Sequence, residues 1–516
     1  MDSPASSTPW HQSMKLLLIV TILLPPVGLV MLWLRKDTPT GQKIFATLAL
    51  MAMSASYLYF AYNMGFFRPA DPNMEAHYTE LERQRAEQRA LADNSSATPT
   101  AAAPQAVNPA AAAVANANES TSSPSAARSA RSYWTNYRGP ARDGKYDETP
   151  IRTNWPVDGL PLLWKQPVGG GYASFVVAEG VAFTIEQRRN QEIVAAYDVE
   201  TGRELWTHAS DAEFRESMGG DGPRATPTWE AGRLYALGAE GDLRCFDART
   251  GKLNWSRNIL KDNGASNLQW GMSGAPLIVD DKVVVLPGGR AGKSVAAYNK
   301  MTGAPVWKSL NDTQAYVSPM LVTLAGKRQI LVETANRVVG LAPEDGSLLW
   351  ETSWNTDMGI NCSQPVVIDA NRIFLSSGYG KGAALVEISG DGSGMSARKV
   401  WENSSMKNKF NSSVLYNGNI YGLDEGILTC VDINSGERRW KGGRYGYGQV
   451  LLANGHLVVI TDTGDLVLVK ATPDKHTEIA KFAAIEGKTW NYPAIAGGRL
   501  LVRNQTQMAC FDVSGK

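Results

Sequence analysis

Residues able to hold a metal ion occur together in one short stretch of the chain. Asp211, Glu213, Glu216 and Asp221 could supply oxygen ligands to calcium, but their spacing matches no EF-hand loop. The chain has only 5 histidines, so a metal centre built on histidine is not expected either. We therefore interpret the stretch as a solvated loop, and the sequence predicts no metal site.

The nucleophilic residues form no catalytic pattern. The 4 cysteines are too few to frame a disulfide scaffold of this size, and no two of them are adjacent. Cys245, Cys430 and Cys510 each stand two residues before an aspartate at the same place in a repeated sequence, which predicts small buried side chains in separate repeats. Cys362 stands alone near an expected inner strand. No nucleophile-elbow, phosphate-loop or zinc-protease motif occurs in its required context, so no catalytic residue is predicted.

The elements that would position a site come from a repeated motif. Residues 196–206 read Ala-Tyr-Asp-Val-Glu-Thr-Gly-Arg-Glu-Leu-Trp, and the pattern returns along the chain in degenerate forms. The aspartate and the following Thr-Gly predict a tight turn, because a carboxylate accepts backbone N–H bonds and Gly can take a positive φ. The tryptophan predicts a dock against the next repeat through its ring and its indole N–H. The motif residues that we interpret as structural are Asp198, Gly202, Trp206, Asp247, Gly251, Trp255, Trp307, Trp350, Trp401, Trp440 and the upstream Trp164.

The spacing of the repeat predicts an all-β, eight-bladed β-propeller with four-stranded blades. Successive motif tryptophans lie about 40 to 50 residues apart, which is the period of propeller blades. Runs of four to seven β-branched or aromatic residues between turn residues supply the strands. The last repeat, residues 510–516, lacks a fourth strand, and the segment near Trp164 lacks a third. We expect residues 162–168 to complete the last blade and close the ring, which removes exposed sheet edges.

The residues about three positions before the middle of each inner strand are the most informative about function. Residues at this register are expected to converge on one mouth of the central channel, where aromatic side chains and an arginine could hold a flat ligand or a peptide. Channel packing is the competing interpretation, because converging strands must fill their axis. The candidate rim residues are Tyr172, Arg224, Trp270, Tyr316, Phe410, Tyr447 and Trp490.

The region before the repeats predicts a membrane anchor and a tether. Residues 16–34 and 44–63 are apolar runs long enough to span a bilayer as helices, and the basic loop between them predicts a cytoplasmic connection with both termini outside. A cleaved secretory signal is the alternative. The predicted organisation is an extracytoplasmic tail (1–15), two transmembrane helices (16–64), a charged, solvated helical stalk (65–92), a disordered linker (93–132) and the propeller (133–516). This organisation places the protein in a bacterial inner membrane, with the propeller on the periplasmic side.

The Ala-Tyr-Asp-x-x-Thr-Gly-x-x-x-Trp repeat resembles the tryptophan-docking motif of the quinoprotein alcohol dehydrogenase-like propellers, or PQQ-like repeats. The resemblance covers about residues 134–516. It implies either a pyrroloquinoline-quinone dehydrogenase, with calcium and a disulfide between adjacent cysteines, or a non-enzymatic scaffold of the BamB type. Because the adjacent cysteines are missing, no cofactor is expected; the quinone and calcium remain compatible with the family but lack supporting residues.

Three functions therefore compete. The favoured hypothesis is an anchored, monomeric propeller that binds a protein or a cell-envelope ligand and catalyses nothing. A quinone-dependent dehydrogenase acting on alcohols or sugars is the alternative, and a membrane receptor ranks last because the cytoplasmic loop is too short for an effector domain. The net charge of +1 offers no long-range field for nucleic acid, so that class of partner is excluded.

Overall fold

The computed structural model describes residues 30, 32–35, 38–63, 72–96, 133–391 and 394–515. The chain divides into two compact units. The smaller contains Met1–Ala70 together with Glu216–Met218, and the larger contains Asp71–Arg215 and Gly219–Lys516.

The smaller unit contains helix α3, Thr40–Asn63. Within the described residues, no helix is both long and apolar enough to cross a membrane. The prediction of two transmembrane helices is therefore not supported: its second span coincides with α3, and most of its first span lies outside the described residues.

The larger unit confirms the predicted eight-bladed β-propeller. Its strands form eight sheets of four antiparallel strands, one of which gains a fifth strand. Blades 1 and 2 contain β3 (Val176–Ala178), β4 (Val181–Arg188), β5 (Gln191–Asp198), β6 (Glu204–Ser210), β7 (Thr228–Glu230), β8 (Arg233–Leu237), β9 (Asp242–Asp247) and β10 (Leu253–Asn258). A short helix, α6 (Ile259–Asn263), follows. Blades 3 and 4 contain β11 (Leu277–Val279), β12 (Lys282–Val285), β13 (Val295–Asn299), β14 (Pro305–Ser309), β15 (Met320–Leu324), β16 (Lys327–Glu333), β17 (Arg337–Leu341) and β18 (Leu348–Ser353).

The remaining blades follow the same order from the axis outward. Blades 5 and 6 contain β19 (Val366–Val367), β20 (Arg372–Ser377), β21 (Gly382–Asp391), β22 (Gly394–Asn403), β23 (Val414–Tyr416), β24 (Asn419–Asp424), β25 (Ile427–Asp432) and β26 (Arg438–Arg444). Blade 7 contains β27 (Gln449–Ala453), β28 (His456–Ile460), β29 (Asp465–Lys470) and β30 (Glu478–Ala483), with β1 (Lys145–Tyr146) added at its inner edge. Blade 8 contains β31 (Ala494–Ala496), β32 (Arg499–Arg503), β33 (Gln507–Asp512) and β2 (Leu162–Pro167).

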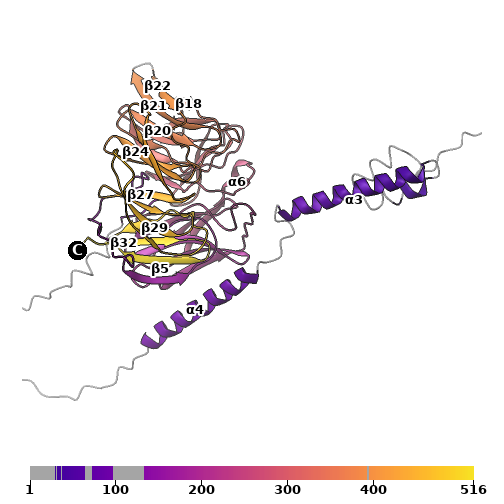
Figure 1. The fold of residues 1–516 in the computed structure, drawn as a ribbon, viewed down its shortest axis with the longest axis horizontal. Helices are drawn as coiled ribbons and strands as arrows, with labels where there is room; N and C mark the ends of the chain where they lie inside the picture. The colour runs from indigo at the N-terminus through magenta and orange to yellow at the C-terminus, as the bar shows by residue number, and fades with distance from the viewer. Residues whose placement is uncertain are drawn as a thin grey trace, which may run out of the picture. The chain divides into compact units, whose positions relative to one another are not determined.

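The ring closes as the sequence predicts. Strand β2, from the start of the repeat region, pairs antiparallel with β33 at the end of the chain, with Trp164 opposite Cys510. This pairing brings the two ends of the repeat region together: in Figure 1 the yellow C-terminal strand β32 lies beside the purple strand β5 of blade 1. One blade thus contains strands from both ends of the repeat region, which holds the ring shut.

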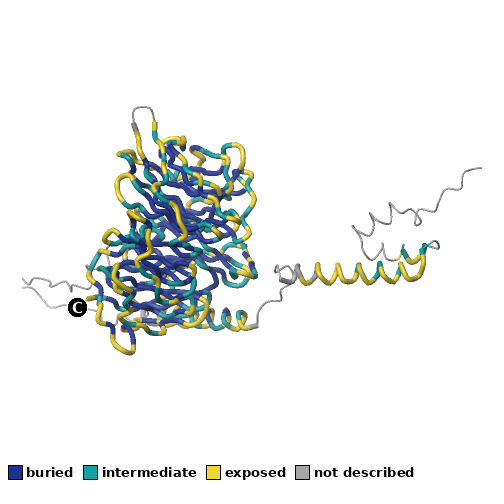
Figure 2. The backbone as a smooth tube through the Cα atoms, turned by 45° about the horizontal axis from the view of Figure 1, so that its top comes forward, coloured by how far each residue is buried: buried dark blue, intermediate teal, exposed yellow. Residues whose placement is uncertain are grey.

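The hydrophobic core is divided among the interfaces between blades. Between blades 2 and 3, for example, Tyr235 and Cys245 pack with Val283 and Tyr298. Figure 2 shows buried backbone concentrated along the strands and exposed backbone at the connecting turns. Hydroxyl side chains also join neighbouring blades close to the axis, where Ser318 Oγ accepts a 2.9 Å bond from the backbone N–H of Ala275. Both the buried apolar faces and these polar bonds fix each blade against the next.

Helix α4, Pro72–Ser96, packs on the propeller. The prediction of a solvated stalk is wrong, because Tyr78, Leu81 and Arg85 are buried. Arg85 donates to the carbonyl oxygen of Pro167 in blade 8 (2.8 Å) and lies 3.6 Å from the Glu204 carboxylate in blade 1. The helix therefore bridges the two blades at which the ring closes.

Candidate functional site

The tryptophan-docking motif forms the contacts between blades. The indole N–H of Trp206 donates to the carbonyl of Ala248 in the next blade (3.0 Å), and Asp198 accepts from the backbone N–H of Thr201 (2.8 Å) to close the turn. The equivalent donations to the next blade come from Trp164 (2.8 Å), Trp255 (3.0 Å), Trp307 (3.2 Å), Trp401 (2.9 Å) and Trp440 (2.8 Å). These residues maintain the architecture and leave the functional site to be found elsewhere.

Trp350 departs from this pattern. Its indole N–H donates to the side-chain oxygen of Gln329 in its own blade. The next blade has a long hairpin, formed by β21 and β22, in place of the tight Asp-x-x-Thr-Gly turn. The expectation that Trp350 docks on the neighbouring blade through its N–H is therefore wrong, because the acceptor turn is replaced there.

The centre of the ring is filled by residues 133–147 of the same chain. The carbonyl oxygens of Trp134, Thr135 and Gly144 accept bonds of 2.8, 2.9 and 2.9 Å from backbone N–H groups in the inner strands of blades 1, 2 and 7. Strand β1 pairs in parallel with β27, the inner strand of blade 7. Because these contacts are made to inner strands, which line the axis, the segment lies at the axis of the ring. We call residues 133–147 the plug.

Two buried arginines anchor the plug. Arg142 donates to the carbonyl oxygens of Pro319 (2.9 Å) and Ala275 (3.2 Å) in blades 4 and 3, and Arg138 donates to that of Ser413 in blade 6 (2.7 Å). Burial without a carboxylate partner lowers the pKa of Arg142 to about 9, so the guanidinium stays protonated at neutral pH. Its charge is stabilised by carbonyl dipoles and by the Thr228 hydroxyl, without a carboxylate, which ties several blades to one side chain.

Four of the predicted rim residues form one aromatic cluster. The Trp490 ring stacks on Phe410 (4.8 Å between centroids) and on Tyr172 (5.6 Å), and Tyr447 meets Phe410 at 5.3 Å. All four side chains are half-buried. They come from the connections leading into four different blades, at the end of the ring where each inner strand begins.

Cationic side chains surround these rings. The Lys488 ammonium lies 3.7 Å from the Trp490 centroid, and Lys409 lies 5.2 Å from that of Tyr447. The guanidinium of Arg224, another predicted rim residue, lies 5.5 Å from the Tyr172 centroid. We call Tyr172, Phe410, Tyr447 and Trp490, with Arg224, Lys409 and Lys488, the rim cluster. The two lysines were not predicted, although each stands one or two residues from a predicted aromatic residue.

Buried amides hold the rim cluster in place. The Gln449 side chain donates to the carbonyl oxygens of Phe410 (3.1 Å) and Trp490 (2.8 Å). Asn491 donates to those of Gly171 (3.1 Å) and Ala173 (3.0 Å), on either side of Tyr172. The aromatic rings are therefore positioned by their backbone before any ligand arrives, which lowers the entropy cost of binding.

Trp270 and Tyr316, the remaining predicted rim residues, form a separate pair with ring centroids 5.8 Å apart. Cys362, just before the inner strand of blade 5, interacts electrostatically with Glu333 at the end of β16. Burial raises the pKa of the Glu333 carboxyl well above its usual value, and burial together with Glu333 raises the pKa of the Cys362 thiol. Both shifts favour the uncharged forms of these two groups, so neither the carboxyl nor the thiol is activated as a base or a nucleophile.

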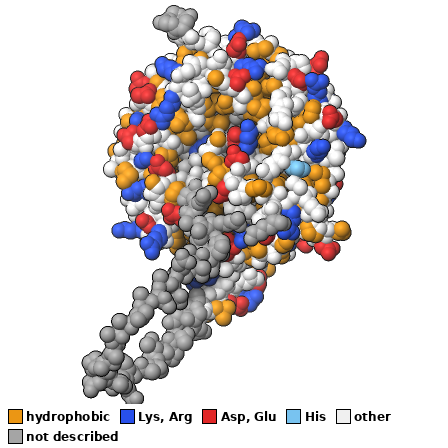
Figure 3. All heavy atoms as spheres, turned by 90° about the vertical axis from the view of Figure 1, so that its left-hand side faces the viewer, with side chains coloured by type: hydrophobic (Ala, Val, Ile, Leu, Met, Phe, Trp, Pro, Cys, Tyr) orange, Lys and Arg blue, Asp and Glu red, His pale blue; other side chains and the backbone are white. Residues whose placement is uncertain are grey.

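The acidic stretch does not gather into a site. Glu213 pairs with Arg215 (2.7 Å), and Asp211 accepts from Gln191 (3.3 Å). Over the described part of the chain, no group of three or more His, Cys, Asp or Glu side chains could hold a metal ion. On the face shown in Figure 3, acidic and basic side chains are interspersed, which matches the near-zero net charge.

These features define a class of protein: a closed, eight-bladed, tryptophan-docked β-propeller with its axis plugged by its own chain. A family model described as "Outer membrane protein assembly factor BamB" matches residues 158–271 and 189–442, together more than half of the chain. The chain therefore belongs to this family of PQQ-repeat propellers.

The relatives include both dehydrogenases and BamB assembly factors. The chain is 31% identical over 138 residues to a 1-butanol dehydrogenase (cytochrome c) from Thauera butanivorans, a match that covers 25% of this chain and 19% of that one. It is 22% identical over 283 residues to BamB of Burkholderia pseudomallei, covering 46% and 71% of the two chains. The crystal structure of quinohemoprotein alcohol dehydrogenase from Comamonas testosteroni superimposes with a TM-score of 0.53 at 14% identity, over 76% of this chain and 82% of that one. The structural likeness concerns the fold, and the chain spans only about a fifth of the length of its dehydrogenase relative.

Proposed function

We propose that this chain is a non-catalytic binding propeller whose rim cluster receives a segment of a partner protein. The rim cluster itself carries the proposal: four half-buried aromatic rings and three cations lie at one end of a ring whose centre is already filled by the plug. Aromatic residues and arginine dominate the energetics of protein interfaces, where a large rigid ring loses little entropy on binding. The match to the assembly-factor model supports the same kind of role.

The chemistry of the cysteines supports binding over quinone-dependent oxidation. All 4 cysteines are free, and they belong to different blades or connections. The adjacent pair that the dehydrogenases use therefore has no counterpart in the sequence. The plug also brings Arg138 and Arg142 towards the rim end of the axis, the region that an enclosed cofactor would need.

Site-specific crosslinking tests the proposal. A photo-crosslinking amino acid at Tyr447, introduced in cells, is expected to give one defined adduct that Trp490→Ala abolishes. The same amino acid at Tyr416, on the opposite face, is the matched control and should give no such adduct. Robust dye reduction by the purified chain with pyrroloquinoline quinone, calcium and an alcohol would overturn the proposal in favour of the dehydrogenase.

The cellular location is part of the same proposal. We propose that the propeller lies on the extracytoplasmic side, and the basic residues around Arg35 and Lys43 support this, because basic loops next to apolar segments tend to stay in the cytoplasm. An alkaline phosphatase fused after Lys516 should then be active, because that enzyme forms its disulfides only outside the cytoplasm. An inactive but intact fusion would overturn the assigned location without affecting the rim cluster.

A further inference from the structure

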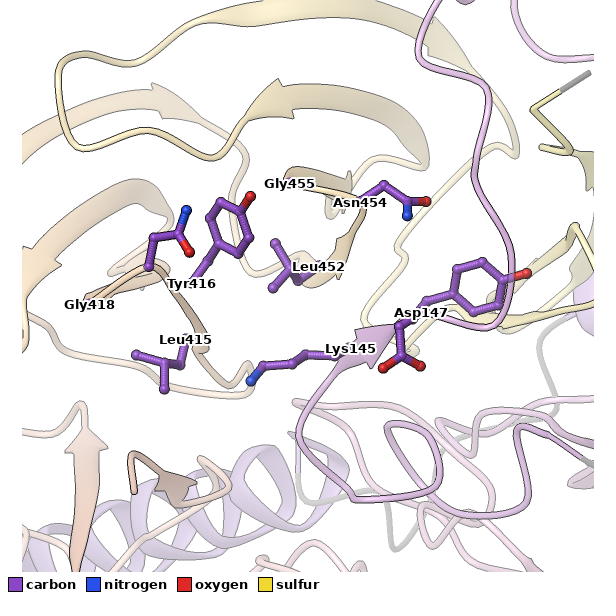
Figure 4. Close-up of a pocket in the computed structure, with 10 residues that line it drawn as sticks. Lys145, Asp147, Leu415, Tyr416, Gly418, Leu452, Asn454 and Gly455 are labelled. Carbon is purple, nitrogen blue, oxygen red and sulfur yellow. The ribbon is translucent and has the colours of Figure 1, made fainter. Parts of the chain in front are cut away.

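A second candidate site lies at the other end of the propeller. A pocket of about 470 Å³ opens beside the inner strands of blades 6 and 7. Its lining residues are Lys145, Tyr146, Asp147, Leu415, Tyr416, Asn417, Gly418, Leu452, Asn454 and Gly455. Figure 4 shows Lys145 extending from β1 toward Leu415, with Tyr416 and Leu452 from the neighbouring blades across the space.

The pocket and the rim cluster lie at opposite ends of the ring. Phe410 precedes strand β23 and Asn417 follows it, while Tyr447 precedes β27 and Asn454 follows it. Each inner strand crosses the ring along its axis, so residues before and after the strand emerge at different ends. A ligand in the pocket would therefore leave the rim cluster accessible.

The polar groups of the pocket are held in place by neighbours. Tyr133 donates to one carboxylate oxygen of Asp147. The Asn454 side-chain oxygen accepts from the backbone N–H of Ile151 (2.8 Å), which leaves its amide N–H groups for another acceptor. Lys145 lies 3.7 Å from Asp143, which limits the positions of its ammonium group.

The backbone turns are equally fixed. Asn417 and Asn454 both adopt positive φ, at +45° and +46°, in Asn-Gly turns that join the first two strands of blades 6 and 7. These tight turns are rigid hairpin connections, so the two amides keep a constant separation. The pocket is thus formed before it is occupied.

The lining has the chemistry of a sugar site. One carboxylate, one ammonium, two amides and two phenols offer both donors and acceptors, as a ring of vicinal hydroxyl groups requires. The charges of Lys145 and Asp147 balance, which disfavours phosphates and acidic peptides. Tyr416, Leu415 and Leu452 add apolar surface for the C–H face of a pyranose, and the volume is within the range of small-ligand sites.

We infer that this pocket binds a neutral saccharide of one or two sugar units. The carboxylate of Asp147 and the amides of Asn417 and Asn454 would bond the hydroxyl groups, while Tyr416 would lie against the ring. The inference is independent of the proposed function, because the rim cluster contributes no residue to the pocket.

Saturation-transfer NMR on the purified chain tests the inference. The probes are glucose, galactose, N-acetylglucosamine, maltose and chitobiose, each measured alone. At least one should receive saturation from the wild-type protein, and Asn417→Gly and Lys145→Met should each weaken its binding by about tenfold, the equivalent of one lost hydrogen bond. Glycine suits the positive φ of Asn417, so that variant removes the amide and preserves the turn.

Ala231→Gly is the matched control, because Ala231 also has a positive φ (+47°) in the equivalent turn of blade 2. It should bind like the wild type, as should the rim variant Trp490→Ala. The inference is overturned if no sugar binds, if binding survives both pocket variants, or if inorganic phosphate displaces the sugar.

Discussion

The indole of Trp206 is in contact with the next blade both through its N–H and through its ring. The N–H donates to Ala248, and a Cβ added to Gly251 would come within 2.6 Å of the ring. The same approach recurs between Gly202 and Trp164, at 2.6 Å, and between Gly303 and Trp255, at 2.7 Å. The glycine of each motif thus serves two needs: it takes the positive φ of the turn and leaves space for the tryptophan of the preceding blade.

This relationship predicts coupled effects on stability. Trp206→Ala should lower the free energy of unfolding by about 3 kcal/mol, the usual loss for a large packed aromatic side chain. Gly251→Ala should cost about 2 kcal/mol, since alanine at φ +72° is strained and its Cβ would meet the Trp206 ring. In the Trp206→Ala background the contact with the ring is gone, so Gly251→Ala should cost only about 1 kcal/mol. Urea unfolding of the two single variants and the double variant measures all three values.

Additive losses in that double-mutant cycle would contradict the contact between Trp206 and Gly251. Gly326→Ala is a useful control. Gly326 has a similar positive φ (+73°), but an added Cβ would meet nothing within 4 Å. Gly326→Ala should therefore lower the free energy of unfolding only by the backbone strain of alanine at a positive φ, about 1 kcal/mol.

The fold could be predicted from the sequence because each blade repeats the same local chemistry. The Asp-x-x-Thr-Gly turn and its tryptophan need only local bonds and one neighbouring blade, so their regular return along the chain, even in degenerate copies, implies a ring of eight blades. The register of the rim residues followed from the same alignment, which explains why Phe410, Tyr447 and Trp490 meet as expected.

The plug and the docked helix could not be predicted, for different physical reasons. The plug is short and rich in turns, and its contacts are backbone bonds to inner strands far away in the sequence, such as Gly144 to Leu452. In α4 the buried positions Tyr78, Leu81 and Arg85 do follow a helical spacing, but the third is an arginine and the stripe reads as polar. The pocket was missed because its Asn-Gly turns look like ordinary hairpin turns, and only β1 makes them part of a cavity.

Because α4 docks on the propeller through one of its arginines, replacing Arg85 should reduce thermal stability much more than replacing Arg83. Arg85→Met should lower the thermal midpoint by several degrees, because about 2 kcal/mol is lost when Pro167 and Glu204 lose their buried partner. Limited proteolysis should then cut near α4 faster than in the wild type. Arg83→Met is the matched control: Arg83 is exposed and, among the described residues, forms ion pairs with Glu80 and Glu87 on the same helix, so its loss should change the midpoint little. Equal effects of both variants would show that α4 does not stabilise the junction of blades 8 and 1 through Arg85.

Glu333 predicts a stability that depends on pH. Its carboxyl is 2% exposed, and its Oε1 has no hydrogen-bond partner among the described residues. Burial raises its pKa well above the usual value, so the folded state holds a proton that the unfolded state releases above about pH 4. This contribution to stability is complete at low pH and is lost as the pH rises toward the folded pKa.

The isosteric variant Glu333→Gln removes that loss. Its thermal midpoint should match that of the wild type near pH 4 and exceed it at pH 8. At pH 8 the free energy of unfolding should be higher than in the wild type by about 1–3 kcal/mol, the usual cost of an unsatisfied buried polar group. Differential scanning calorimetry across this range gives the comparison. Glu344→Gln, at an exposed position in the turn of the same blade, should leave the pH profile unchanged. A midpoint for Glu333→Gln below that of the wild type at pH 8 would mean that the carboxylate has a partner.

The contacts of Arg142 predict that the shape of its guanidinium stabilises the plug as much as its charge does. Its guanidinium contacts carbonyl oxygens of Ala275 and Pro319 and the hydroxyl of Thr228, at distances of 3.2, 2.9 and 3.3 Å. Arg142→Lys keeps the positive charge, but one compact ammonium cannot match the planar fork that reaches three blades. The variant should therefore lose about 1–3 kcal/mol, because buried acceptors remain unsatisfied. Arg249→Lys, at an exposed turn of blade 2, should cost almost nothing in the same urea titration. If Arg142→Lys were as stable as the wild type, the hydrogen bonds of the Arg142 guanidinium would contribute nothing to stability, and the backbone bonds of the plug would hold it in place.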